Sequence, residues 1–126
     1  MEEINQITYV VRSAIFEVHR ELGPGLFERV YEAALARELK DLGLSVSRQY
    51  TKSLMYKGEL LGEAYVIDLL VENKVIVEIK SVENLQNVHK KQLMTYLRLS
   101  GCKVGLLVNF NSGYLVDKES LIRIIV

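Results

Sequence analysis

The sequence contains one cysteine, one proline and no tryptophan among its 126 residues. A single cysteine excludes an internal disulfide and fits a reducing compartment, so we expect a cytoplasmic protein. Because cysteines and histidines do not cluster at ligand spacing, the sequence indicates no zinc site. No apolar run approaches the length of a membrane span, and the Met-Glu-Glu-Ile start lacks the basic residues of a signal peptide. We therefore expect no contact with a membrane.

The sequence also lacks an excess of charge of either sign. Sixteen basic residues balance sixteen acidic ones, which excludes a global field that would attract nucleic acid. Binding of nucleic acid would therefore depend on a local patch, and most basic positions are equally compatible with an ordinary solvated surface. The candidates for such a patch are Arg48, Lys52, Lys57, His89, Lys90 and Lys91. A phosphate-binding loop of the GxxxxGK[ST] type is absent.

What is present is a clear alternation of helical and strand patterns. Apolar residues at helical spacing predict helices over residues 2–21, 26–42 and 85–100. Strand patterns cover residues 45–56, a hairpin over 64–80, and the segments 103–110, 114–116 and 121–126. We expect one α/β (α+β-like) domain over residues 1–126, with a central mixed sheet and flanking helices. The third helix is expected to join two parallel strands.

The hairpin carries three charged residues in otherwise apolar strands: Asp68, Glu78 and Lys80. A three-residue loop at Glu72-Asn73-Lys74 would pair Val71 with Val75 and place Asp68 opposite Glu78. In that register the three charged side chains share one face of the hairpin. The other face is then apolar and consists of Ile67, Leu69, Val71, Val75, Val77 and Ile79.

Two explanations for these charges remain open. Lys80 could form a surface salt bridge with Asp68 or Glu78 on the solvated face of the hairpin. Alternatively, the two carboxylates could hold a divalent cation, which would turn their mutual repulsion into coordination. Lys80 beside them could then orient a water molecule or stabilise negative charge.

Three stretches of the chain resemble motifs of one nuclease superfamily. Asp68, followed after nine residues by Glu78-Ile79-Lys80, resembles the PD-(D/E)xK motif of restriction-endonuclease-like nucleases, although Ile67 stands where that motif has proline. Gly25-Leu-Phe-Glu28-Arg-Val-Tyr31 resembles the GxxExxY signature of a family of small proteins in that superfamily. Gln92-Leu-Met-Thr-Tyr96 is similar to the QxxxY motif of RecB-like members. The resemblance spans nearly the whole chain.

The resemblance implies a restriction-endonuclease-like core and a Mg²⁺- or Mn²⁺-dependent nuclease, with DNA as the favoured substrate and a homodimer as one possible assembly. It assigns catalysis to Lys80, Glu78 and Asp68, metal binding to Asp68, Glu78, Glu28 and the Ile79 carbonyl, and substrate binding to Gln92, Tyr96 and His89. Helical spacing places Glu28, Tyr31 and Glu32 on one helix face. The alternative is a non-catalytic nucleic-acid-binding or dimerisation module with the same fold. Neutral net charge favours this module, whereas the intact set Asp68, Glu78 and Lys80 favours the enzyme.

Overall fold

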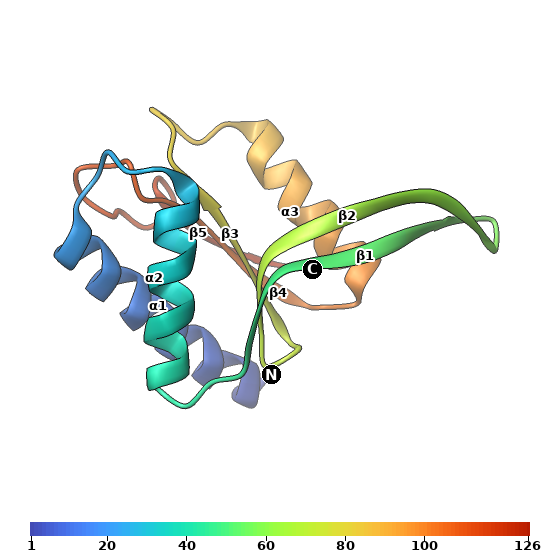
Figure 1. Cartoon of the computed structure of the whole chain (residues 1–126), viewed down its shortest axis with the longest axis horizontal. Coiled ribbons are helices and arrows are strands. Elements are labelled where there is room, and N and C mark those ends of the chain that lie inside the picture. The colour runs from blue at the N-terminus through green and yellow to red at the C-terminus, as the bar shows by residue number, and fades with distance from the viewer.

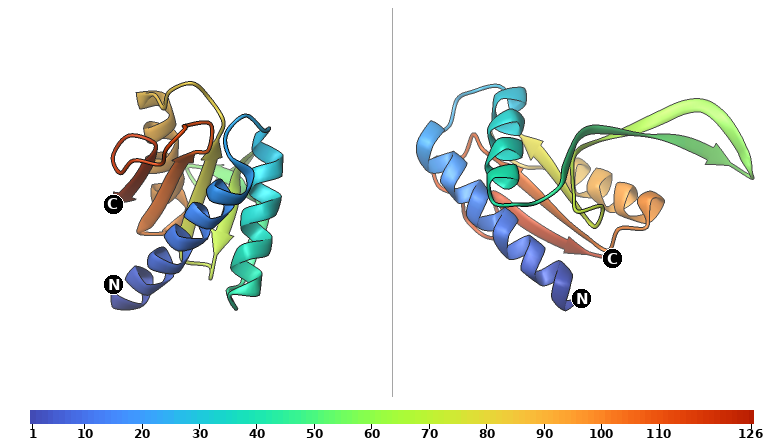
Figure 2. Two further views of the ribbon diagram at one scale, coloured as in Figure 1. Left: turned by 90° about the vertical axis from the view of Figure 1, so that its left-hand side faces the viewer. Right: turned by 60° about the horizontal axis from the view of Figure 1, so that its bottom comes forward.

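The structure, a computed structural model, describes residues 1–126 as a five-stranded mixed sheet with helices on both faces (Figures 1 and 2). The elements are α1 (Glu2–Leu22), α2 (Glu28–Asp41), β1 (Val46–Tyr56), β2 (Glu59–Val71), β3 (Val75–Lys80), α3 (Asn87–Ser100), β4 (Val104–Asn109) and β5 (Leu121–Ile125). This confirms the predicted fold class of a central mixed sheet with flanking helices. No helix is both long enough and apolar enough to cross a membrane.

Two hydrophobic clusters hold the three layers together. The larger one joins the apolar stripes of α1 and α2 to one face of the sheet, and Ile15, Leu35 and Leu39 are fully buried in it. The smaller one joins α3 to the opposite face through Leu93 and Leu97. Each helix buries its apolar side, as an amphipathic segment on a sheet is expected to do.

The strands follow their order in the sequence, β1-β2-β3-β4-β5, so β3 is the central strand. Strand β3 pairs in parallel with β4, and the other neighbours are antiparallel. The parallel pair that α3 was predicted to connect is therefore confirmed. The strand expected over residues 114–116 is not formed. Instead, the carbonyl of Val116 accepts hydrogen bonds from the amides of Glu119, Ser120 and Leu121, which fold this segment into a tight turn.

The predicted register of the β2–β3 hairpin is confirmed by the pairs Val71–Val75 and Leu69–Val77. The loop between the strands contains three residues, and two of them adopt the left-handed conformation, Glu72 with φ 54° and Asn73 with φ 55°. Asparagine tolerates that conformation because its short polar side chain can hydrogen-bond locally. The glutamate is fixed by tertiary contacts, since its side chain accepts a hydrogen bond from the amide of Ser45 at 2.6 Å.

One part of the predicted face assignment is wrong. Ile67 was expected on the same face as Leu69, but Ile67 packs in the α3 cluster whereas Leu69 packs beneath α1 and α2. The regular alternation breaks at the intervening Asp68. Opposite this break, Gln49 of β1 has a φ of 48°, which lies outside the extended region. The two strands therefore change faces together at this position.

Beyond this break β1 and β2 continue as a two-stranded ribbon that leaves the body of the molecule (Figures 1 and 2). We call residues 50–67 the arm. Strand β2 has 13 residues, whereas its neighbour β3 has only six, so most of β2 has β1 as its sole partner. The strand also begins earlier than the predicted residue 64. Between residues 51 and 64 every residue except Leu54 is exposed.

Candidate active site

The candidate site lies where β2 parts from β3. The amide of Asp68 donates a hydrogen bond of 2.8 Å to Oε2 of Glu78, and the amide of Ile79 donates one of 2.8 Å to Oδ2 of Asp68. Backbone pairing of the two strands ends one step earlier, at Leu69 and Val77. The two carboxylates thus replace the hydrogen bonds that the diverging strands no longer make with each other. This reciprocal arrangement fixes both side chains at the fork.

Burial dominates the electrostatics of this pair. Glu78 is only 3% exposed, and its burial, together with the charge of Asp68, raises its pKa from 4.5 to about 8. Burial likewise raises the pKa of Asp68, although the hydrogen bond from the Ile79 amide opposes that effect. An isolated buried carboxylate disfavours its charged form because it has lost its hydration. The fork therefore holds two carboxylates that lack sufficient compensating positive charge.

Lys80, at the end of β3, is a positive charge that acts on both carboxylates. Its charge lowers the pKa of Asp68 and of Glu78, but less strongly than burial raises either one. The side chain is half-buried and makes no ion pair within 4.0 Å and no hydrogen bond. The surface salt bridge considered from the sequence is therefore not formed. The ammonium group remains free to contact a ligand.

A cavity of about 450 Å³ opens beside Asp68 and is lined by Glu28, Arg29, Glu32, Gln49, Asp68 and Ile79. Helix α2 begins at Glu28, so this carboxylate approaches from the helix N-terminus. It also accepts a hydrogen bond of 3.4 Å from the amide of Ser81, just after β3. The structure thus brings Glu28 to the same cavity as Asp68. Glu78 precedes the lining residue Ile79 on β3, and the charge of Glu28 adds to the causes that raise the pKa of Glu78.

Two residues that the sequence analysis did not assign belong to this site. Glu32 is 5% exposed and forms an ion pair of 3.2 Å with Arg48. The side-chain amide of Gln49 donates to Glu32 at 2.6 Å and to Asp68 at 3.2 Å, and so connects the two carboxylates. The available signal was the spacing of Glu28 and Glu32, which places both on one face of α2. Gln49 gave no signal, because its position depends on the break in β1.

The three predicted substrate-binding residues, Tyr96, Gln92 and His89, differ in burial and in the contacts of their side chains. Tyr96 is half-buried, and burial followed by the charges of Glu78 and Asp68 raises its pKa, which locates it beside the carboxylates. Gln92 is exposed, and its side chain makes no hydrogen bond within the chain. His89 uses Nδ1 to accept a hydrogen bond of 2.9 Å from the amide of Gln86, as part of the capping box of α3. This hydrogen bond occupies Nδ1 of the His89 ring at the start of α3.

The residues of the Gly25–Glu28–Tyr31 motif have identifiable structural roles. Gly25 has a φ of 100°, a conformation that favours glycine. Tyr31 is fully buried, stacks on the ring of Phe110 at 4.5 Å and donates from its hydroxyl to the carbonyl of Gly23 at 2.5 Å. The same hydroxyl accepts from the amide of Leu26 at 3.1 Å. The tyrosine therefore holds the turn that precedes α2 and positions Glu28.

The carboxylates of Asp68, Glu78 and Glu28 could bind a cation only together with further ligands. No group of three or more His, Cys, Asp or Glu side chains is arranged to hold a metal ion. The expected set Asp68, Glu78 and Glu28 is therefore not a complete ligand shell. The donor chemistry nevertheless fits, because two desolvated carboxylates of raised pKa would be stabilised by a divalent cation. Mg²⁺ is commonly held by one or two carboxylates, with water and substrate phosphate completing its shell.

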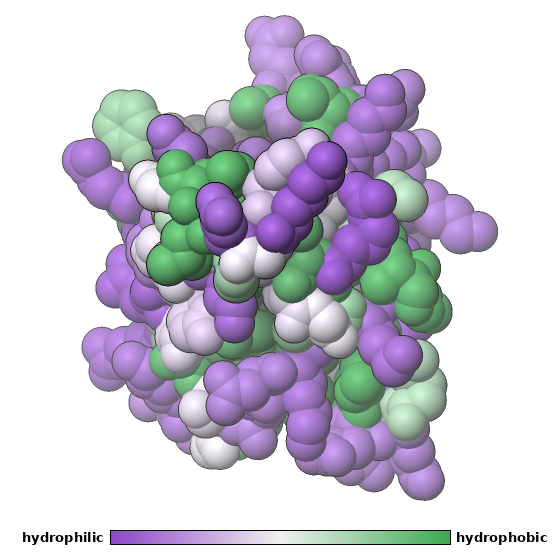
Figure 3. All heavy atoms as spheres, turned by 90° about the vertical axis from the view of Figure 1, so that its right-hand side faces the viewer, coloured by the Kyte–Doolittle hydropathy of each residue, from purple (hydrophilic) through white to green (hydrophobic).

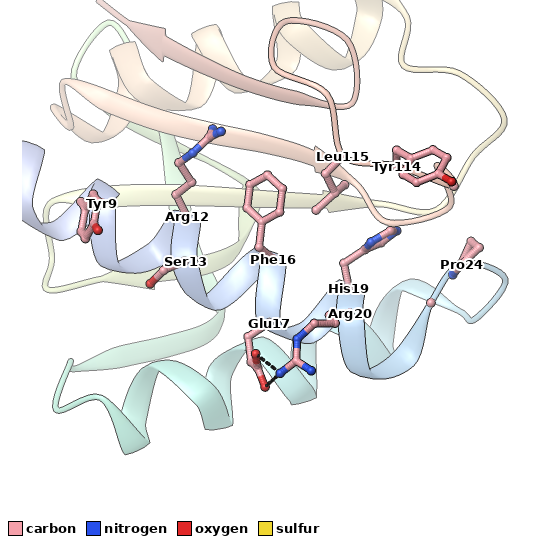
Figure 4. A pocket seen from close by; sticks show the side chains of 12 residues that line it. Tyr9, Arg12, Ser13, Phe16, Glu17, His19, Arg20, Pro24, Tyr114 and Leu115 are labelled. Atoms are coloured by element: carbon pink, nitrogen blue, oxygen red, sulfur yellow. Dashed lines mark hydrogen bonds and ion pairs between the residues drawn. The ribbon is translucent and has the colours of Figure 1, made fainter.

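A larger cavity, of about 760 Å³, lies elsewhere, between α1 and the loop before β5 (Figure 4). Arg12, Phe16 and His19 extend into it from α1 toward that loop, while Glu17 pairs with Arg20 on the other side of the helix. His19 makes a 2.7 Å contact with the carbonyl of Ser112. This cavity contains none of the buried carboxylates at the fork.

Comparison with known proteins agrees with this geometry. Residues 5–124 match the family described as the PD-(D/E)XK nuclease superfamily. No match is found among curated proteins or among solved structures. The matched region includes the fork, the arm, strands β1 to β4, helices α2 and α3, and all of β5 except its last residue. Since it also covers nearly the entire chain, the protein belongs to the PD-(D/E)XK nuclease superfamily.

Proposed function

We propose that the protein hydrolyses phosphodiester bonds of nucleic acid, with DNA as the substrate class and Mg²⁺ or Mn²⁺ as the cofactor. Membership of the superfamily supports a nuclease-type function and a nucleic-acid substrate. The observation that carries the more specific proposal is the pair Asp68 and Glu78. Both are held by backbone amides, both have raised pKa values, and an unpaired lysine follows them.

In this proposal Asp68 and Glu78 hold the cation, with the carbonyl of Ile79 as a further ligand. When bound, the cation supplies Lewis-acid stabilisation of charge on the phosphate. Lys80 orients the attacking water and adds positive charge beside the phosphate oxygens. The amides of Asp68 and Ile79 keep the two carboxylates in place throughout, because each amide donates to the carboxylate across the fork.

Supporting roles follow from the lining of the cavity. Glu28 adds a third carboxylate near the site, and Gln49 restrains Asp68 through its hydrogen bond. Tyr96 borders the carboxylates on the α3 side and, with Gln92, is assigned to the substrate backbone. We further propose that the chain is a GxxExxY-type member of the superfamily. The support is that Tyr31 and Gly25 shape the turn that presents Glu28.

Cleavage assays on single-stranded, double-stranded and branched DNA, with and without Mg²⁺ or Mn²⁺, test the proposal. Wild type should cut at least one substrate only when metal is present, and Lys80→Ala should abolish cutting. The matched control is Lys40→Ala, which removes an exposed lysine near the C-terminal end of α2, away from Glu28. Metal-independent cutting, or cutting that survives Lys80→Ala, would contradict the proposed roles.

The second candidate is a non-catalytic nucleic-acid-binding module, and the balanced charge of the chain is the observation that favours it. The same assays separate the two. A module would bind the substrates and leave them intact at every metal concentration. Binding without cutting, in protein that remains folded, would therefore replace the enzyme with the module.

A further inference from the structure

The arm is an unusual feature for a chain of this size, because residues 55–64 at its outer end are all exposed. A two-stranded ribbon alone is marginally stable in water. Its tip nevertheless exposes large apolar side chains, with Met55 and Tyr56 each 60% exposed, Leu60 69% and Leu61 54%. Figure 3 views this end of the molecule and shows hydrophobic groups interspersed with hydrophilic ones. Scattered apolar side chains are ordinary on a protein surface, so a partner is indicated only by the side of the arm that faces α3.

One side of the arm is continuous with the candidate site. In β1, Tyr50 pairs with Ile67 and Lys52 pairs with Tyr65. Directly paired residues point to the same face of a sheet, and both Ile67 and Tyr65 pack in the α3 cluster. Tyr50 and Lys52 therefore lie on the side of the arm that faces α3. They occupy this side because the strands change faces at Gln49 and Asp68.

This side carries a row of tyrosines that ends beside the carboxylates. The rings of Tyr65 and Tyr96 stack at 5.1 Å with an angle of 27° between their planes. Burial, followed by the charge of Glu78, raises the pKa of Tyr96. Tyr50 follows Gln49 at the break in β1 and is 36% exposed. The hydroxyl of Tyr65 is buried and has no hydrogen-bond partner, although buried hydroxyl groups usually have one. The row thus combines the partly exposed rings of Tyr50 and Tyr96 with the buried ring of Tyr65, whose hydroxyl has no partner.

The charges of β1, the edge strand of the arm, favour an anionic partner over a second copy of this chain paired through that edge. The charged residues of β1 are Lys52 and Arg48, of which Arg48 is paired with Glu32, and the strand contains no acidic residue, whereas β2 contributes Glu59 and Glu63 to the arm. Lys57 follows at the turn, where its ammonium lies 5.4 Å from the ring centre of Tyr56. If two copies paired through their β1 edges, each basic residue could meet only basic or neutral residues. A polyanion instead complements this strand.

We propose that the α3-facing side of the arm binds unpaired bases of single-stranded nucleic acid and leads that strand to the carboxylates at the fork. This inference rests on the proposed function and specifies its substrate class. Aromatic rings bind bases of any sequence by stacking, and lysines along the same path bind the phosphates. A base-paired duplex keeps its bases stacked on one another, so it cannot use the tyrosine row in the same way.

Binding is measured by fluorescence anisotropy with a labelled oligothymidylate and with a blunt duplex of equal length, in EDTA so that no metal-dependent cutting occurs. The single strand should bind more tightly than the duplex. Tyr50→Ala should weaken single-strand binding by about fivefold or more, since stacking on one aromatic ring contributes that much. Tyr50→Phe, which keeps the ring, should bind as wild type does. Tyr114→Ala is the matched control, because Tyr114 is 84% exposed and lines the remote cavity beside α1.

Lys52→Ala provides a second readout that does not depend on the stability of the Tyr50 variant. Removal of one phosphate contact should reduce the slope of log affinity against log salt by about 0.7 for a single strand. An unchanged slope, together with unchanged affinity of Tyr50→Ala, would overturn the inference. Tighter binding of the blunt duplex would overturn it as well. So would a dimer in sedimentation that Leu60→Ser dissociates while single-strand affinity stays constant.

The outcome is separable from that of the proposed function. Tyr50-dependent binding of single strands in a protein that never cuts DNA would support the arm surface and refute the nuclease. Metal-dependent cutting by a protein whose single-strand affinity is unaffected by Tyr50→Ala would support the nuclease and refute the arm surface.

Discussion

Replacement of Glu78 by glutamine should make the protein more stable in mildly alkaline solution without metal. The folded protein binds a proton at Glu78 more tightly than the unfolded chain does, because the pKa is raised from 4.5 to about 8. Between these two values, stability should therefore fall as the pH rises, by about 1.36 kcal/mol per pH unit for one such group. The accumulated loss at pH 8 is on the order of 5 kcal/mol.

Glutamine removes this loss and preserves the main contact. Its side-chain oxygen can still accept the hydrogen bond that the Asp68 amide donates to Glu78. We expect the free energies of unfolding of wild type and Glu78→Gln to be similar near pH 5 and to diverge up to pH 8, with the variant more stable. Asp68→Asn should show the same trend, because burial raises the pKa of Asp68 too.

Urea denaturation from pH 5 to 8 in EDTA measures the divergence. Glu59→Gln is the matched control, since Glu59 is exposed and begins β2 at the tip of the arm. Mg²⁺ or Mn²⁺ should then narrow the difference at pH 8 and reverse the order of stability below about pH 6.5, where the accumulated loss of wild type is smaller than the gain from the metal. A ligand bound only to the folded state adds about 2.7 kcal/mol at a hundredfold excess over Kd, and the variant should lose this gain. Parallel stability curves for wild type and Glu78→Gln, in EDTA and in metal, would refute the reasoning.

Three further perturbations test other parts of the structure. Lys80→Ala should abolish cutting and retain most of the metal-induced rise in Tm, because the lysine is assigned to water and phosphate. Arg48→Ala should lower the free energy of unfolding by about 1–3 kcal/mol in urea denaturation, because it leaves the buried Glu32 without its ion pair. Gly105→Ala should cost about 1–3 kcal/mol in the same assay, because the added Cβ would lie 2.7 Å from Cδ1 of Leu93.

Each stability change has a control of the same type within the chain. Arg37→Ala removes an exposed pair with Asp41 at i,i+4 spacing, for which we expect only about 0.3–0.5 kcal/mol. Gly113→Ala places its Cβ in open space and should be nearly neutral. Equal effects of Arg48→Ala and Arg37→Ala would show that Glu32 does not need a buried partner. A neutral Gly105→Ala would show that α3 can shift away from β4.

The periodicity of apolar residues predicted the helices and the central hairpin, because these elements depend on residues that are close together in the sequence. A charged residue in an apolar strand restricts the register severely, and Asp68, Glu78 and the loop at Glu72-Asn73-Lys74 agreed on one pairing. The same argument failed for Ile67. It assumed strict alternation along β2, whereas Gln49 and Asp68 interrupt the alternation on both strands.

The residues that sequence reasoning missed depend on contacts between distant segments. Glu32 and Arg48 meet because α2 lies against β1, and nothing in either local pattern requires their pairing. His89 shows the same dependence on structure. The sequence placed it on one helical stripe with Gln92 and Tyr96, and the structure adds that its Nδ1 accepts a hydrogen bond from the backbone at the start of α3. The capping of α3 depends on the conformation of the preceding loop, which the spacing of apolar residues along the helix does not predict.

The fork and the arm have a common physical origin. When β2 leaves β3 to form the arm, the amides of Asp68 and Ile79 lose the partners that a continued pairing would provide. Unpaired buried amides are costly, and the two carboxylates satisfy them. The carboxylates are thereby buried and their pKa values raised, which creates the demand for a positive charge. The departure of β2 also turns Tyr50 and Lys52 toward α3, so the proposed binding surface begins where the proposed chemistry takes place.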